Sequence, residues 1–209
     1  CAVSTDELRE ALRECFHKDN ITVVDLNPES LEHVLENILL VADHLDVGRK
    51  GEELVSKMQR SFGDVRVKTK ECCHRPRIAH IEWIEPMMVA GHWMMSLIEM
   101  VGSINVFPDE ARRWIGFEEF VQQDPEKILI APCGFSIQRS LKDMPFLDKR
   151  PGWNTLKAVR AHEVYICEGS HYFNRPGPRL VDSLEILAEI FHPDFFAAKH
   201  YQSGWIRFG

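Results

Sequence analysis

The sequence is most informative at first for what it lacks. It contains no run of about 18 apolar residues, so it predicts no membrane-spanning helix. No basic block offsets the net charge of −7, which argues against nucleic-acid binding. Neither G-x-G-x-x-G, the Walker A motif nor G-x-S-x-G is present. The chain therefore lacks the common signatures of nucleotide-binding enzymes and serine hydrolases, and we predict that it is not an enzyme.

Cysteine is present without a pattern that identifies a site. Six cysteines in 209 residues do not form the disulfide framework of a small secreted protein. Cys72, Cys73 and His74 are contiguous, but adjacent cysteines are poor partners on one tetrahedral zinc, and no second Cys/His pair stands at a suitable spacing. Cys133 lies between a proline and a glycine, yet no Cys-His-Asn spacing of a known family accompanies it. We expect no metal site and no catalytic residue.

Along the chain, segments with a strand-like apolar pattern alternate with segments whose apolar residues recur at helical spacing. Short β-branched runs predict strands, and apolar residues three and four apart predict helices. The expected strands span residues 21–26, 78–82, 127–131 and 163–167. The expected helices span residues 4–17, 29–45, 91–102, 117–123, 136–144, 153–160 and 178–191, with one more beginning near residue 52. Strands that alternate with helices predict an α/β fold with a parallel sheet covered on both faces.

The helical pattern in the first third of the chain has two breaks. Gly48 and Gly51 are expected to interrupt it, with the next helix resuming near Glu52. Between residues 65 and 77 the apolar pattern fades, so this stretch is the best candidate for a domain boundary. The tail after Pro193 is aromatic without a period, and we expect it to pack onto a neighbour rather than to be disordered.

One loop, residues 169–180, combines aromatic side chains with a stiff backbone. Its two prolines fix φ and its two glycines permit positive φ. The loop follows the strand expected over residues 163–167, and open α/β sheets bind ligands at the carboxyl ends of their strands. We therefore predict that it is a binding loop presenting His171, Tyr172 and Arg175.

Two further loops, residues 82–93 and 131–136, leave the carboxyl ends of neighbouring strands and should lie beside it. The residues expected at this shared edge are Trp83, His92, Trp93, Phe135, His171, Tyr172 and Arg175. An aromatic wall with a few polar groups suits a large, flat, partly apolar small molecule. The alternatives are that Trp83 is a buried anchor, that His92 packs against its own helix, and that the nearby methionines fill the core.

Several motifs, taken in order, resemble one known family. They are Arg-Ile-Ala-His-Ile-Glu-Trp at 77–83, Pro86, Ala-Gly-His-Trp at 90–93, Ala-Pro-Cys-Gly-Phe at 131–135, Pro-Gly-Trp at 151–153 and Tyr-Phe-Asn-Arg-Pro-Gly-Pro-Arg at 172–179. As a set they resemble the vitamin B12-binding, BtuF-like branch of the substrate-binding proteins of ABC importers. That group also includes siderophore- and haem-binding members.

The resemblance implies a fold of two α/β lobes bridged by a helical backbone, with the ligand between them. Residues 1–26 would be a remnant of the first lobe, which would be largely missing from this chain. Residues 27–76 would be the helical connector, residues 77–193 the second lobe, a parallel-sheet three-layer α/β unit, and residues 194–209 a tail.

The resemblance also implies a function, which is to bind a cobalamin-like corrinoid without catalysis and deliver it to the permease of an ABC importer. Cobalamin would be the bound ligand, and the protein would have no cofactor of its own. Trp83, Phe135 and Tyr172 would lie against the corrin ring, and Arg175 would make a polar contact. Whether His92 or His171 coordinates cobalt stays open. The acidic candidates for permease docking are Asp109, Glu110 and Glu118.

Other functions remain open from the sequence. A ferric siderophore or haem could replace the corrinoid, although more Arg and Tyr and fewer Trp would then be expected in these loops. An enzyme that uses Cys133 and a histidine is a third hypothesis, and an interaction module that has lost the cleft is a fourth. The resemblance places the protein outside the cytoplasmic membrane, periplasmic or lipid-anchored. The lack of a visible leader keeps a cytosolic relative open.

Overall fold

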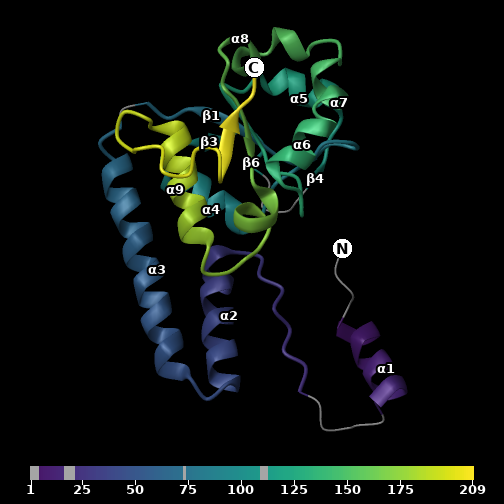
Figure 1. The fold of residues 1–209 in the computed structure, drawn as a ribbon, viewed down its shortest axis with the longest axis vertical. Helices are drawn as coiled ribbons and strands as arrows, with labels where there is room; N and C mark the ends of the chain where they lie inside the picture. Colours follow the sequence, from purple (N-terminus) through teal and green to yellow (C-terminus); the bar gives the residue numbers. More distant parts are fainter. Residues whose placement is uncertain (1–4, 17–21, 73, 109–112) are drawn as a thin grey trace.

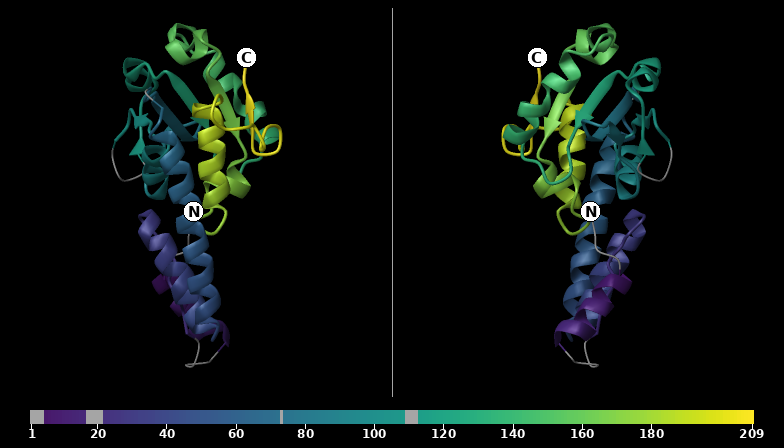
Figure 2. Two further views of the ribbon diagram at one scale, coloured as in Figure 1. Left: turned by 90° about the vertical axis from the view of Figure 1, so that its left-hand side faces the viewer. Right: turned by 90° about the vertical axis from the view of Figure 1, so that its right-hand side faces the viewer.

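The computed structural model describes residues 5–16, 22–72, 74–108 and 113–209. They form a layered α/β body from which a pair of long helices extends (Figures 1 and 2). Helix α1 (Thr5–Phe16) stands apart from that body in Figure 1. Within the described ranges, no helix is both long and apolar enough to cross a membrane.

The pair of long helices consists of α2 (Leu31–His44) and α3 (Gly48–Thr69), which pack antiparallel. Ser30 begins the pair because its Oγ accepts the N–H of His33 at 3.1 Å and so caps α2. Each helix buries one apolar stripe, which packs against the other helix and against one face of the α/β body. The spacing of the apolar residues predicts such a stripe.

Gly51 lies inside α3, so the prediction that it interrupts the helical pattern is wrong. A Cβ built at Gly51 would lie only 2.5 Å from the Cβ of Ala42 in α2. The glycine thus allows two helix backbones to approach closely, and the packing gained outweighs its low helix propensity. Helix α3 also continues to Thr69, past the point at which the apolar pattern fades.

The sheet has a parallel centre and antiparallel margins. Strands β1 (Arg77–Trp83), β5 (Lys127–Ile130) and β6 (Val164–Cys167) run parallel, and β3 (Ile104–Asn105) pairs parallel with the start of β1. The antiparallel margins are β2 (Met88–Val89), β4 (Arg113–Trp114) and β7 (Trp205–Arg207). The predicted parallel sheet is confirmed for the centre, whereas the margins were not predicted.

Alternate residues of the central strands face two separate apolar layers, so the three-layer α/β fold class is confirmed. One layer packs Ile78, Leu129, Tyr165 and Cys167 against α2, α3, α4 (Trp93–Met100) and α9 (Leu180–Phe191). The other packs Ala79, Ile81, Ile128, Ile130 and Ile166 against α5 (Phe117–Gln123), α6 (Ile137–Asp143), α7 (Pro145–Asp148) and α8 (Lys157–Arg160). Burying β-branched residues on both faces is typical of parallel sheets.

One buried carboxylate holds the C-terminal tail. Glu189 of α9 is 3% exposed and accepts hydrogen bonds from the Nδ1 of His200 at 2.7 Å and from the indole N–H of Trp205 at 2.8 Å. It also accepts the main-chain N–H of Lys199 at 3.1 Å. The aromatic tail, which we expected to pack onto a neighbour, therefore packs onto its own chain and adds β7 beside β6.

One predicted strand is wrong. Residues 22–28 have no regular secondary structure, despite the β-branched residues of 21–26, whose first residue lies outside the described ranges. None of the described strands pairs with this segment, and an extended segment gains ladder hydrogen bonds only from a partner. The division into units at residues 26, 76 and 193 stays a prediction.

Candidate ligand-binding site

The carboxyl ends of β1, β5 and β6 lie side by side, and hydrogen bonds tie together the loops that follow them. The N–H of Cys133 donates to the carbonyl of Glu82 at 3.1 Å, which joins the second loop to the end of β1. The N–H of Ser170 donates to the carbonyl of Phe135 at 3.1 Å, which joins the third loop to the second. The structure thus places these loops along one continuous edge, the strand-end edge.

Close main-chain contact fixes the third loop against the second. A Cβ at Gly169 would lie 2.3 Å from the carbonyl oxygen of Pro132, so only glycine fits there without a shift. The Asn174 amide, oriented so that its nitrogen donates, reaches the carbonyl oxygens of Pro132 at 3.2 Å and Gly169 at 2.8 Å. Between them the chain forms one π-helical turn (Gly169–Phe173), a rare geometry that is frequent at functional sites.

An aromatic pair lies at this edge. The rings of Trp83 and Phe135 are 5.1 Å apart with an interplanar angle of 55°, and both side chains are partly exposed. The indole N–H of Trp83 donates to the carbonyl of Glu85 at 3.1 Å, which fixes the ring. On the same Phe135 ring, the guanidinium of Arg139 lies 4.5 Å from the centroid, a cation–π distance.

A buried carboxylate organises the third loop from beneath. Glu168 is 7% exposed, and its Oε2 accepts the main-chain N–H of Ile137 at 3.1 Å. Its Oε1 accepts the hydroxyl of Ser170 and lies 3.2 Å from the Nδ1 of His171. His171 is therefore held at the surface by an acid, with which it forms an ion pair when protonated.

Tyr172 and Arg175 lie in the same loop but are placed differently from the aromatic pair. The ring of Tyr172 contacts His171 at 6.4 Å and His200 of the tail at 6.0 Å, and it packs partly onto the core that contains α9. Arg175 is exposed, and its Nε donates to the carbonyl of Ser170 at 2.7 Å. Tyr172 thus borders the site from the tail side, and Arg175 is folded back onto its own loop.

The structure separates His92 and Trp93 from this group. Trp93 is 5% exposed and belongs to the core at the start of α4, so its placement gives no support to the predicted ligand contact. His92 has a positive φ of 55° and stacks on Trp93 at a ring distance of 6.0 Å. It packs against its own helix, the alternative considered from the sequence.

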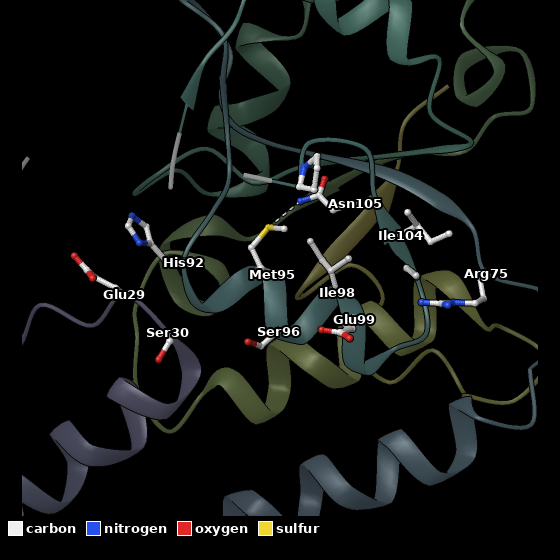
Figure 3. A pocket seen from close by; sticks show the side chains of 12 residues that line it. Glu29, Ser30, Arg75, His92, Met95, Ser96, Ile98, Glu99, Ile104 and Asn105 are labelled. Atoms are coloured by element: carbon white, nitrogen blue, oxygen red, sulfur yellow. Dashed lines mark hydrogen bonds between the residues drawn. The ribbon is translucent and has the colours of Figure 1, made fainter. Parts of the chain in front are cut away.

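His92 instead lines a separate pocket of about 490 Å³ (Figure 3). The pocket lies between the start of α2, helix α4 and β3, with His92 and Glu29 at one end and Arg75 at the other. Glu99 lines it too, and inside it the amide of Asn105 lies 3.1 Å from the sulfur of Met95. None of the other six predicted site residues lines this pocket, whose lining mixes polar and apolar residues and carries both signs of charge.

Sequence reasoning missed Arg139 and Glu168. Arg139 is the third residue of α6, and Phe135 directly precedes the N-cap Ser136, so the first turn of the helix brings Arg139 back over that ring. Glu168 directly follows the predicted strand, and a carboxylate in that place can accept hydrogen bonds from the adjoining loops. These spacings were visible signals, but neither residue belongs to a motif.

Among the cysteines, Cys167 is fully buried at the end of β6. Burial, followed by the charge of Glu168, raises the pKa of the Cys167 thiol, which makes it unreactive. Cys133 is partly buried beside the aromatic pair. Of the contiguous Cys72, Cys73 and His74, which we expected not to form a metal site, Cys73 lies outside the described residues. Within the described residues, no group of three metal-binding side chains occurs.

Comparison with known proteins identifies similar chains. Residues 3–170 match the family model for periplasmic binding proteins. The "uncharacterized ABC transporter substrate-binding lipoprotein YvrC" of Bacillus subtilis (strain 168) is 25% identical over 184 residues, which cover 84% of this chain and 55% of that relative. The chain thus spans about half the length of this curated relative.

Solved structures of low sequence identity share the fold. An ABC transporter substrate-binding protein from Listeria monocytogenes EGD-e has a TM-score of 0.76 at 15% identity, covering 91% of this chain and 75% of its own. The periplasmic heme-binding protein RhuT from Roseiflexus sp. RS-1 has a TM-score of 0.75 at 19% identity, covering 92% of this chain and 73% of its own. An ABC-type Fe3+-hydroxamate transport system from Saccharomonospora viridis DSM 43017 has a TM-score of 0.66 at 21% identity, covering 79% of this chain and 57% of its own.

Proposed function

The chain belongs to the periplasmic binding protein family, and on that premise we propose that it binds a cobalamin-like corrinoid at its strand-end edge for delivery to an ABC importer. The observation that carries this proposal is the Trp83–Phe135 pair. Two partly exposed rings on tied loops offer a rigid apolar face to a flat macrocycle. Tyr172, His171 and Arg175 border the same face in the proposal.

The proposed role is capture without chemistry. The buried Cys167 thiol is unreactive, and Glu168 and Arg175 at the strand-end edge hold loops through hydrogen bonds. The partner of a loaded binding protein would be the importer's permease, so the proposal includes a location outside the cytoplasmic membrane. The lipoprotein relative supports this location. Of the acidic candidates for docking, Glu118 of α5 is exposed, while Asp109 and Glu110 lie outside the described residues.

A second candidate ligand is haem or a ferric siderophore. Two of the structures that share the fold are named for heme and for Fe3+-hydroxamate. One observation in this chain favours such a ligand, namely the Arg139 guanidinium on the Phe135 ring, because these ligands often carry acidic groups. An interaction module without a small-molecule ligand remains the third candidate.

Tryptophan fluorescence tests the proposal. We expect cyanocobalamin, and in a separate titration haem, to quench the 209-residue chain saturably if the ring binds at this edge. Trp83→Phe should lose most of the saturable quenching. The matched control is Trp114→Phe, since Trp114 is 58% exposed on β4 and outside the site. If neither ligand gives saturable quenching, the proposal is contradicted. It is also contradicted if the saturable quenching persists in Trp83→Phe.

A further inference from the structure

Arg139 is the cationic side chain that contacts the aromatic pair directly. Its guanidinium lies 4.5 Å from the centroid of Phe135, whose ring in turn contacts Trp83 at 5.1 Å. Any flat ligand that lies against these rings would therefore meet the guanidinium at its rim. Stacking on an aromatic ring is a geometry that arginine adopts because its guanidinium is planar and weakly hydrated.

Asp143 fixes the orientation of this guanidinium. It lies one helical turn after Arg139 in α6, and its Oδ1 accepts a hydrogen bond from the Nη1 of Arg139 at 2.5 Å. The Arg139 side chain is 47% exposed, while that of Asp143 is 19% exposed. A guanidinium has five N–H donors, so one carboxylate leaves part of the fork facing solvent. The guanidinium thus contacts the Phe135 ring and the Asp143 carboxylate, and its remaining N–H groups face solvent.

Three other charged side chains of the strand-end edge have intramolecular partners. Glu85 accepts from the guanidinium of Arg150, and Glu168 accepts from Ser170 and lies within 3.2 Å of His171. Arg175 donates its Nε to a carbonyl of its own loop. The acids near the aromatic pair are thus engaged, and Arg139 is the group on the ring itself that can accept a further negative partner.

We propose that Arg139 is a specificity-determining residue that reads a carboxylate at the rim of the bound macrocycle, with Asp143 as its positioning residue. This inference rests on the proposed function, because it assigns a ligand class to the same site. Among the corrinoids and other flat metal-bearing rings that this face would bind, the proposal favours those with free acid groups on the rim. A ring whose rim carries only amides or esters binds more weakly, because it leaves the guanidinium without an anionic partner.

Two pairs of probes distinguish the contribution of the acid groups to affinity from that of the ring. Dicyanocobyrinic acid and dicyanocobinamide share a corrin ring and cobalt, but the first carries carboxylates and the second amides. Haem and haem dimethyl ester share a porphyrin ring and iron, and only haem carries free carboxylates. Dissociation constants for the 209-residue chain come from absorbance and fluorescence titrations. We expect the acid member of the pair that binds to bind about tenfold more tightly.

The variants test which residue produces that preference. Arg139→Gln should abolish the acid preference while keeping affinity for the neutral member, and Arg139→Lys should retain only part of it. Asp143→Asn removes the charged partner that fixes the guanidinium, so it should reduce the acid preference by roughly threefold while affinity for the neutral member stays unchanged. The matched control is Arg160→Gln, which removes the same charge from exposed Arg160 of α8, at the opposite end of the sheet. It should leave the preference unchanged.

The outcomes separate this proposal from the proposed function. If neither pair binds the native chain, the proposed function fails and the assignment of Arg139 fails with it. If a ring binds but its acid and neutral forms bind equally, the function stands and the role of Arg139 is overturned. Equal losses in Arg139→Gln and Arg160→Gln would also overturn it, because they would indicate attraction to overall charge alone. Unchanged far-UV circular dichroism and urea midpoints confirm that the variants fold.

Discussion

The two ends of the central strands use charge in opposite ways. At the amino end, Lys127 of β5 pairs with Glu163, which also accepts the hydroxyl of Tyr165, and Arg207 of β7 donates to that same hydroxyl. These groups thus form one network of an ion pair and hydrogen bonds with one another. At the carboxyl end, aromatic rings and the half-exposed Arg139 face solvent. The network at the amino end contributes to the stability of the fold, whereas the carboxyl end is the surface that we propose binds the ligand.

The largest effect should come from breaking the amino-end network. Glu163→Ala leaves Lys127, whose side chain is only 14% exposed, without its acid, and should lower the free energy of unfolding by about 3 kcal/mol. Urea denaturation measures the loss. Ligand affinity should not change under conditions in which the variant is folded, whereas Arg139→Gln should change stability by less than about 0.5 kcal/mol. A matching loss of stability in both variants would remove the contrast between the two ends.

The converse change removes a ring from the carboxyl end. Phe135→Ala should weaken binding of the macrocycle by roughly tenfold, because it removes half of the aromatic face and the ring beneath Arg139. Titration of the variant against cyanocobalamin and against haem measures this loss. The matched control is Phe146→Ala, since Phe146 is 55% exposed on α7 and should leave affinity unaltered. Equal affinity in the two variants would show that the ligand lies elsewhere.

Acid should weaken the amino end through Glu163. Burial opposes ionisation of this carboxyl, but hydrogen bonds from Lys127 and Tyr165 outweigh it and lower its pKa below the ordinary value of 4.5. A depressed folded-state pKa adds stability that is present above pH 4.5 and is lost as the pH falls through the folded-state pKa. Urea denaturation at neutral and acidic pH should therefore show a smaller acid loss in Glu163→Ala than in the native chain. An equal loss would mean that Glu163 has no depressed pKa.

The smallest effect should come from Asp124, at the same end of the sheet. Its Oδ1 accepts the main-chain N–H of Lys157 at 2.8 Å where α8 begins, and this bond lowers its pKa. Asp124→Asn keeps an acceptor but loses the charge, so it should cost about 0.5 kcal/mol of stability without altering binding. A loss as large as that of Glu163→Ala would show that the network extends further than the contacts indicate.

Much of the fold was predictable because its signals are local. The apolar period of the segment 127–130 predicts the buried strand β5, and helix α5 has the bounds that its sequence predicts. The two-residue strands β2, β3 and β4 were not predictable, since each depends on a partner that is distant in sequence. The strand predicted over residues 21–26 fails for the same reason, because none of the described strands pairs with the β-branched residues of 22–26.

The candidate site was predictable in outline and less so in detail. The rule that ligands bind at strand ends placed Trp83 and Phe135 at one edge, where their rings meet. It also included Trp93, which the first turn of α4 rotates into the core. It missed Arg139, because the register of a short helix and the pairing with Asp143 decide where that guanidinium points. Sequence thus indicates which loops converge, whereas packing decides which side chains remain at the surface.

Fluorine NMR of the chain labelled with fluorotryptophan tests most directly whether the carboxyl end is the ligand surface. The chain has five tryptophans, and Trp-to-Phe variants assign their resonances. On adding cyanocobalamin or, separately, haem, we expect the resonance of Trp83 to shift or broaden with saturation, while those of exposed Trp114 and buried Trp153 stay in place. A saturable change at Trp114 or Trp153 with an unmoved Trp83 would contradict the account.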